Sequence, residues 1–330
     1  MKKILLSVFA VAAFYSCQNE EANVAENQPE AIAPITTQRT CISQEIHERQ
    51  LQETPGLYQK MLDIENFTNR FSKSYNPVLA NASGRLLANG SIQIPVVFNV
   101  LYNTAAENIS LAQLQSQIDV LNKDFNALNS DFNNPTPFDA VKANVGITFV
   151  LDQVVRKSTT KTTWGTRDAM KKGSSGGLSP ISPTTKLNIW ICTIGGGILG
   201  YAQFPGGSSA TDGVVFDGKY TGSTGTATYP YNLGRTATHE VGHWMNLRHI
   251  WGDANCGSDL VSDTPTMDSP NGGVPAPGLR STCTGTPLEM YMNYMDYTDD
   301  RGMFMFSNGQ KTRMGAVFAV GGSRASFRNL

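Results

Sequence analysis

The chain has 330 residues, of which 40 % are hydrophobic, so it is long and apolar enough to bury a substantial core in one large domain or two modest ones. Its formal net charge of −1 provides no basic surface, which argues against nucleic acid as a partner. Only 16 % of the residues are charged, and Gly is abundant, a balance typical of loop-rich extracellular proteins.

The N-terminus has the features of an export signal. Two lysines precede the apolar run ILLSVFAVAAFY, which is too short to span a bilayer. Cys17 follows Ser16, so we predict a lipoprotein-type signal peptide over residues 1–16 and a lipid anchor at Cys17. An ordinary secretory peptide with an incidental cysteine is the alternative. Residues 17–37 are polar and acidic and are expected to form a disordered tether.

Helical spacing follows over residues 42–72, with an interruption at TPG (54–56). The apolar positions are Ile46, Leu51, Leu57, Met61, Ile64, Phe67 and Phe71. We expect His47 to be a solvated residue of this helical region. Residues 73–91 are rich in turn-forming residues and have no apolar periodicity, so a protease can reach this linker easily.

A second pattern, typical of an α/β domain, begins at Ile92. IQIPVVFNVLY predicts a strand, and residues 109–126 predict an amphipathic helix with a capping box formed by Ser110 and Gln113. Its apolar face comprises Leu111, Leu114, Ile118, Leu121 and Phe125. Further strands are predicted at 145–155, 186–194 and 212–217, separated by long glycine-rich loops. From residue 250 onward the chain is expected to be mostly irregular.

Three of the four histidines lie within eleven residues, HEVGHWMNLRH. His239 and His243 are four residues apart, so on a helix they share one face and can bind one metal ion. His249 supplies a third ligand if the chain turns sharply at Asn246, because asparagine tolerates a left-handed backbone better than any residue except glycine. Three protein ligands plus water are typical of catalytic zinc, and Glu240 is placed to take a proton from that water. Two ordinary helix histidines would explain HExxH alone, but they leave the third histidine unexplained.

These residues resemble the zinc signature of the metzincins, HExxHxxGxxH, with Asn246 at the glycine position. NYMDYTDD (293–300) resembles the methionine turn of that family, with Met295 as its methionine. The wider context is similar to the pappalysin-like metzincins of the bacterial cytophagalysin and ulilysin type. The segments that carry this resemblance, in chain order, are IPVVFNVLY, LNIWIC, GGGILGYAQFP, TDGVVFD, DLVSDTP, NYMDYTDD and SNGQKTRM.

The resemblance implies an α/β (α+β) fold with a mixed twisted sheet, an active-site helix and a loop-rich C-terminal subdomain. It also implies a division of the chain into a pro-segment over 38–88 and a catalytic domain over 89–330. The N-terminal subdomain of that domain would run to about residue 249, and the C-terminal subdomain would cover 250–330.

Several roles come from the resemblance alone. Tyr297 is expected to face the zinc and stabilise the oxyanion, the alternative being an aromatic residue in the wall of the site. Cys256 and Cys283 match the positions of a family disulfide, which would contribute about 3–4 kcal/mol in the chain-entropy model. Cys192 is left as a buried free thiol. Cys41 is expected to occupy the open position on the zinc until activation, unless it is merely unpaired.

Relatives of this type also bind calcium in the loop GDANCGSDLVSDTP. The oxygen donors of that loop predict a calcium site, with turn-capping carboxylates as the alternative. The candidate ligands are Asp253, Asp259, Asp263 and Thr264.

The leading hypothesis is a zinc endopeptidase that is exported as a latent zymogen and acts as a monomer on proteins or peptides. It would be an outer-membrane or cell-surface lipoprotein before processing and secreted afterwards. A lipoprotein binding module that keeps the fold without proteolysis is the alternative, and retention of Glu240 argues against it. A zinc enzyme that acts on other bonds is the third possibility. Asp299, Asp300 and Arg301 carry mixed charge and therefore indicate no preferred substrate side chain.

Overall fold

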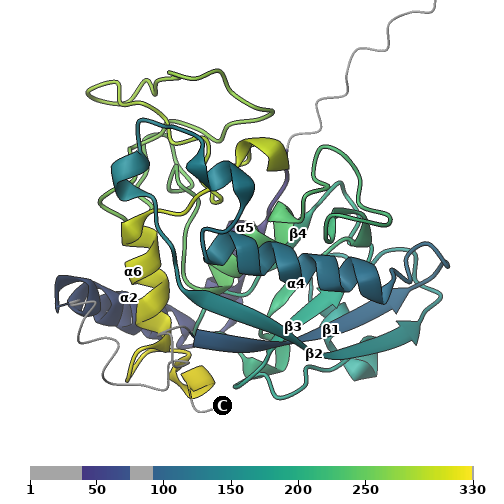
Figure 1. The fold of residues 1–330 in the computed structure, drawn as a ribbon. Helices are drawn as coiled ribbons and strands as arrows, with labels where there is room; N and C mark the ends of the chain where they lie inside the picture. The colour runs from purple at the N-terminus through teal and green to yellow at the C-terminus, as the bar shows by residue number, and fades with distance from the viewer. Residues whose placement is uncertain (1–38, 75–91, 329–330) are drawn as a thin grey trace, which may run out of the picture. The chain divides into compact units, whose positions relative to one another are not determined.

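A five-stranded sheet lies at the centre of the protein (Figure 1). The computed structural model describes residues 39–74 and 92–328, so the predicted signal peptide and tether and most of the predicted linker lie outside the described residues. The strands are β1 (Ile92–Tyr102), β2 (Ile147–Ser158), β3 (Leu187–Ile191), β4 (Gly200–Ala202) and β5 (Val214–Phe216). Their spatial order is β2-β1-β3-β5-β4. All neighbours pair in parallel except β4, which runs antiparallel to β5 at one edge.

Four of these strands correspond to the predicted ones, with small shifts at their ends. β4 does not, because it lies in the glycine-rich stretch that we expected to be a loop. Three residues are too few to show an alternating pattern, and β4 exists because Gly200–Ala202 pair with Val214–Phe216. The edge that β4 forms borders the metal centre described below.

Two helices, α4 (Leu111–Phe125) and α5 (Arg235–Trp244), cover one face of the sheet (Figure 1). The predicted apolar face of α4 is buried except for Leu111, which is 58 % exposed. Half of the predicted capping box forms: the Ser110 hydroxyl accepts from the backbone N–H of Gln113 at 3.1 Å. The amide of Gln113 is buried instead, where it donates to the carbonyls of Gly218 and Thr221.

The opposite face of the sheet is covered by a loop around Trp164 and Met170 and by α1 (Ser43–Glu53). Alternate strand residues such as Trp190 and Val215 point to this side and pack with Ile46 of α1. The segment before residue 75 therefore shares a core with the domain that follows it.

The prediction that His47 is solvated was wrong. Its ring is 7 % exposed and lies 4.7 Å, centroid to centroid, from that of Phe204. Burial, together with the nearby charge of Arg248, lowers the pKa of His47 to about 4. The sequence could not show this, because the burial comes from a segment more than 150 residues further along the chain.

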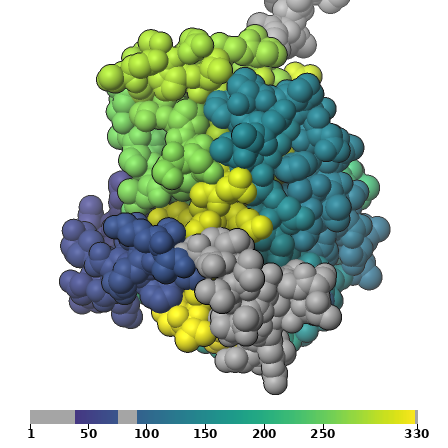
Figure 2. Space-filling model, turned by 60° about the vertical axis from the view of Figure 1, so that its left-hand side comes forward, coloured from purple at the N-terminus to yellow at the C-terminus, as the bar shows by residue number. Residues whose placement is uncertain are grey.

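The second helix of the N-terminal segment, α2 (Leu57–Ser74), packs against α6 (Asn308–Phe318), and the two lie side by side in Figures 1 and 2. α6 interrupts the region that we expected to be irregular, and it begins with a complete capping box of Ser307 and Gln310. Between α5 and α6 the chain consists of loops, turns and one short 3-10 helix, Asp300–Gly302, and a disulfide joins Cys256 and Cys283. Cys192 is a buried free thiol. No helix among the described residues is long and apolar enough to cross a membrane.

Candidate metal centre and active site

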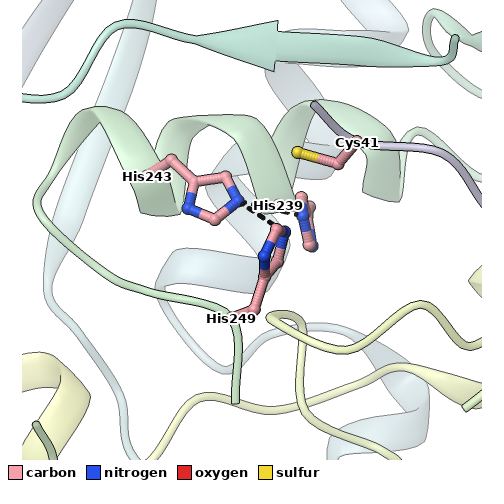
Figure 3. A group of neighbouring side chains, drawn as sticks. All are labelled: Cys41, His239, His243 and His249. Atoms are coloured by element: carbon pink, nitrogen blue, oxygen red, sulfur yellow. Dashed lines mark hydrogen bonds between the residues drawn. The ribbon is translucent and has the colours of Figure 1, made fainter. Parts of the chain in front are cut away.

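α5 and the turn after it bring the three histidines together, as Figure 3 shows. His239 and His243 project from α5, which ends at Trp244. Asn246 then adopts a φ of 72°, the left-handed conformation expected from the sequence. This turn reverses the chain and returns His249 to the other two histidines, with all three side chains buried.

The three imidazoles are arranged as metal ligands. Nδ1 of His239 lies 2.7 Å from the carbonyl of Tyr294, and Nδ1 of His243 lies 2.9 Å from that of Leu247. Because a carbonyl only accepts, Nδ1 carries the proton in both rings, and Nε2 presents a lone pair. Nε2 of His243 lies 3.2 Å from Nε2 of His239 and 3.1 Å from Nε2 of His249. Lone pairs that converge in this way repel one another unless a cation lies between them, so these residues fit a metal ion.

Cys41 completes this group. Its sulfur and the ring nitrogens of the three histidines all lie within 4.8 Å of one another (Figure 3). Burial and the neighbouring Glu240 raise the pKa of the Cys41 thiol well above its usual range. Burial, followed by the neighbouring imidazoles, lowers the pKa of His239 and His243 well below theirs, which keeps both rings neutral. Neutral imidazoles and a cysteine thiolate are ligand types that zinc prefers, and binding of the metal would displace the thiol proton of Cys41.

Glu240 lies next to the histidines with its carboxylate buried. Burial raises its pKa to about 7, although hydrogen bonds from Ser43 and Cys41 oppose that shift. The Ser43 hydroxyl donates to Glu240 Oε2 at 2.9 Å and accepts from the backbone N–H of Ala202 in β4 at 2.8 Å. Ser43 was missed in the sequence, because only the docking of the N-terminal segment brings it to Glu240. The carboxylate is thus held by the segment that also carries Cys41.

The methionine turn, residues 293–300, packs against α5 next to the metal ligands. Met295 is fully buried, and a Cβ on Gly242, between the two helix histidines, would come within 2.5 Å of its sulfur. Tyr297 packs with its ring centroid 5.0 Å from that of His249. Its hydroxyl donates to the carbonyl of Cys41 at 2.6 Å. The Tyr297 hydroxyl therefore already donates to a carbonyl that lies next to the metal ligands, that of Cys41.

Comparison with known proteins identifies the family. Residues 183–319 match the peptidase M43 family, described as pregnancy-associated plasma protein-A. An extracellular metalloprotease of Verticillium alfalfae is 34 % identical over 232 residues, which cover 68 % of this chain and 76 % of the relative. The chain belongs to the pappalysin-like M43 family. Extracellular metalloprotease 1 of Coccidioides posadasii is likewise 34 % identical, and the match covers 69 % of this M43 chain and 77 % of the relative.

Solved structures agree with this assignment. Mature mirolysin of Tannerella forsythia, in complex with a cleaved peptide, is 42 % identical with a TM-score of 0.70, and the match covers 72 % of this M43 chain and 96 % of mirolysin. A variant of Tannerella forsythia promirolysin is 40 % identical with a TM-score of 0.78, covering 88 % of this chain and 97 % of its own. The protein is therefore a metalloprotease with the metzincin fold, as predicted.

The N-terminal segment of this M43 protease also buries an arginine beside the metal centre. Arg39 is 2 % exposed and donates to the Asp300 carboxylate at 2.5 Å and to the Thr236 hydroxyl at 3.2 Å. Its guanidinium lies 4.8 Å from the centroid of the Tyr231 ring. Thr236 precedes His239 by one turn of α5, so Arg39 lies close to the metal ligands. Neither the burial of Arg39 nor its pairing with Asp300 was predicted from the sequence.

The candidate calcium ligands of the loop do not form one cluster. The Asp253 carboxylate contacts Nδ1 of His249. Asp259 accepts from the Thr264 hydroxyl, and Asp263 accepts from the Ser307 hydroxyl and the backbone N–H of Gly309. Within 39–74 and 92–328, the one group of three or more close acidic, thiol or imidazole ligands is that of Cys41 and the three histidines. Asp253 therefore belongs to the surroundings of the metal centre.

Proposed function

We propose that the chain is the exported precursor of a zinc endopeptidase, with the zinc held by His239, His243 and His249. The observation that carries this proposal is the convergence of three Nε2 atoms beside the buried carboxylate of Glu240. When bound, zinc supplies Lewis-acid chemistry and lowers the pKa of water to about 7. The chain's relatives are extracellular metalloproteases, which supports export and a protein or peptide substrate.

Glu240 is proposed as the general base. Its carboxylate lies next to the converging Nε2 atoms of the histidines, where it can take a proton from water and return it to the departing amine. Tyr297 is proposed to donate its hydroxyl hydrogen bond to the substrate carbonyl in place of that of Cys41, and so to stabilise the oxyanion. A binding module without proteolysis needs neither a buried general base nor an aligned hydroxyl, so that alternative is not favoured.

The proposal includes latency. Cys41 would occupy the fourth position on the metal and Ser43 would hold the general base, so water and substrate are excluded together. The structural match supports a pro-segment, because promirolysin extends the matched share of this chain from 72 % to 88 %. Comparing full-length Cys41→Ala with the wild-type precursor tests this role, since the variant should activate prematurely or mature faster.

Activation is proposed to require a cut in the linker 73–91, near Gly84 and Arg85, which lie outside the described residues. The division into a pro-segment at 38–88 and a catalytic domain at 89–330 follows from this proposal. Cys17 lies on the pro side, so the same cut would separate the enzyme, a monomer, from any lipid anchor. N-terminal sequencing of the active form decides the point: a start between residues 80 and 92 supports it, and a start before Cys41 contradicts it.

The contacts of Arg39 bear on the substrate preference. A buried guanidinium paired with Asp300 beside the metal ligands supports the proposal that a basic substrate side chain takes this place once the N-terminal segment has left. We therefore infer that the active enzyme prefers substrates with arginine or lysine next to the scissile bond. Mapping of cut sites in a denatured protein mixture tests the inference, and Asp300→Asn should abolish any preference for basic residues.

Calcium binding by the loop around residues 253–264 stays a prediction. Asp259, whose pKa burial raises to about 6, and Thr264 are the remaining donors whose contacts lie within the loop. Calcium that raises the thermal midpoint of the wild type but not of Asp259→Asn would support a site there.

The decisive experiment is Glu240→Ala in the mature enzyme. The variant should keep one equivalent of zinc and lose peptidase activity against denatured proteins. Asp119→Asn, an exposed carboxylate on α4 bonded to Gln115, is the matched control and should behave as wild type. Wild-type protein without zinc, or full activity in Glu240→Ala, would overturn the proposal.

A further inference from the structure

The N-terminal segment contacts the rest of the protein at a second place, away from the metal. Oε1 of Glu65 in α2 accepts from Nη2 of Arg313 in α6 and from Nδ2 of Asn246, the latter at 3.3 Å. Nε of Arg313 in turn donates to the backbone carbonyl of Asn246 at 2.6 Å. The side chains of Glu65 and Arg313 are only 15 % and 3 % exposed. We call Glu65, Arg313 and Asn246 the α2 clamp.

Apolar contacts surround the α2 clamp. Leu57 and Met61 form a small core with Phe204, which follows β4. Close packing continues along α2: a Cβ on Gly206 would lie 3.0 Å from Ile64, and one on Gly321 would lie 3.3 Å from Phe67. The face that receives α2 therefore consists of α6, the Asn246 turn and the chain after β4. Figure 2 shows α2 lying against the C-terminal residues on this face.

The two contact regions involve different residues and different chemistry. Arg39, Cys41 and Ser43 reach the metal ligands, Glu240 and Asp300. In contrast, α2 packs on α6 and the chain after β4, and its hydrogen bond nearest the metal site is that of Glu65 with Asn246. The turn at residues 54–56 separates α1 from α2. Removal of the thiol from the metal therefore breaks none of the contacts of α2.

The α2 clamp also explains why Asn246 stands at the glycine position of the zinc signature. A glycine would satisfy the left-handed backbone, but only a side chain with a donor can reach Glu65. A buried guanidinium that loses its carboxylate partner is costly, which makes the charge on Glu65 important for holding α2.

We propose that α2 is a second, metal-independent anchor of the N-terminal segment, with the α2 clamp fixing its position on α6 and the Asn246 turn. The inference depends on the proposed function only in treating residues 38–88 as a pro-segment. Its consequence is that latency has two separable parts: loss of the metal contact loosens residues 39–43, which keep the hydrogen bonds of Arg39 and Ser43, while the contacts of α2 are unchanged.

Amide hydrogen exchange of the full-length precursor tests this proposal. With a chelator, residues 39–43 of the wild type should exchange faster while α2 keeps its protection. Glu65→Gln should speed the exchange of α2 by roughly tenfold or more, with or without chelator. Asp63→Asn is the matched control, because Asp63 is an exposed α2 carboxylate bonded only to Gln59 on the same helix. Protection of β1 and β3 reports whether each variant has folded.

Two results would overturn the proposal. One is equal α2 exchange in Glu65→Gln and Asp63→Asn, and the other is loss of α2 protection on chelation to the same extent as residues 39–43. If Glu65→Gln also unfolds the sheet, Glu65→Asp, which keeps the charge on a shorter side chain, replaces it and should give an intermediate effect. A protein that binds no zinc would leave the chelator without effect, yet the Glu65→Gln comparison would still decide the role of α2.

Discussion

Replacement of Asn246 separates the two demands on this residue, its backbone conformation and its side-chain contact. In Asn246→Gly the left-handed φ of 72° no longer costs strain, which gains about 1 kcal/mol. The lost hydrogen bond to Glu65 costs about the same, because it is long at 3.3 Å although its acceptor is charged. We therefore expect the precursor to be nearly neutral to this change. The mature domain, which lacks Glu65, should be mildly stabilised.

Asn246→Val is expected to destabilise the protein, in contrast to Asn246→Gly. A β-branched side chain at positive φ costs about 2 kcal/mol, and the hydrogen bond to Glu65 is lost as well, for a total of about 3 kcal/mol in the precursor. For a domain of this size such a loss lowers the thermal midpoint by about 6 °C or more. Because His249 follows the same turn, zinc content should fall too. Thermal unfolding and metal analysis of both variants, as precursor and as mature enzyme, provide the measurements.

Equal stability and equal zinc content of the Val and Gly variants would refute this account of the turn. If Asn246→Gly changed the free energy of unfolding of the mature domain and of the precursor by the same amount, only the role of Glu65 would be refuted. The two outcomes differ, so the role of the left-handed backbone and the role of the hydrogen bond to Glu65 are tested separately.

Three further predictions follow from single contacts. Asp253→Asn should lose zinc to a chelator roughly 10–100-fold faster than wild type, because a carboxylate orients His249, while Asp119→Asn should not. Burial lowers the pKa of His47 in the folded state to about 4, below its usual value of about 6.5. The neutral ring therefore stabilises the folded protein fully above about pH 6.5, and this stabilisation, at most about 3 kcal/mol, is lost as the pH falls towards 4. His47→Gln should remove this acid loosening of α1, measured by hydrogen exchange at pH 7 and 5. Cys283→Ser should destabilise the mature domain by about 3 kcal/mol in denaturant titrations.

The convergence of the three histidines could be predicted from the sequence because its geometry is local. Two ligands one helical turn apart and a third after a single left-handed residue leave few arrangements besides a shared metal. The strands β1, β2, β3 and β5 were also predictable, since each is bounded by turns and rich in apolar residues. These features depend on short stretches of chain, where spacing determines geometry.

The surroundings of the centre could not be predicted, because they depend on distant partners. Gln113 and Gln310 both stand three residues after a serine at a helix start, yet only Gln310 completes a capping box. The amide of Gln113 is instead used by carbonyls about a hundred residues away. The contact of Asp253 with His249 was missed for the same reason, because the approach of the two side chains appears only in three dimensions.

The position of the proposed cut has a consequence for how activation ends. Arg39, Cys41 and Glu65 all precede the linker 73–91, so a cut there breaks none of their contacts and removes only the covalent link. Contacts that were intramolecular, at an effective concentration in the millimolar range, then become intermolecular. We therefore expect the cut precursor to stay inhibited while concentrated and to become active on dilution, more readily in Glu65→Gln. Activity that appears at full strength immediately after the cut, at every concentration, would show that the contacts do not survive the loss of the link.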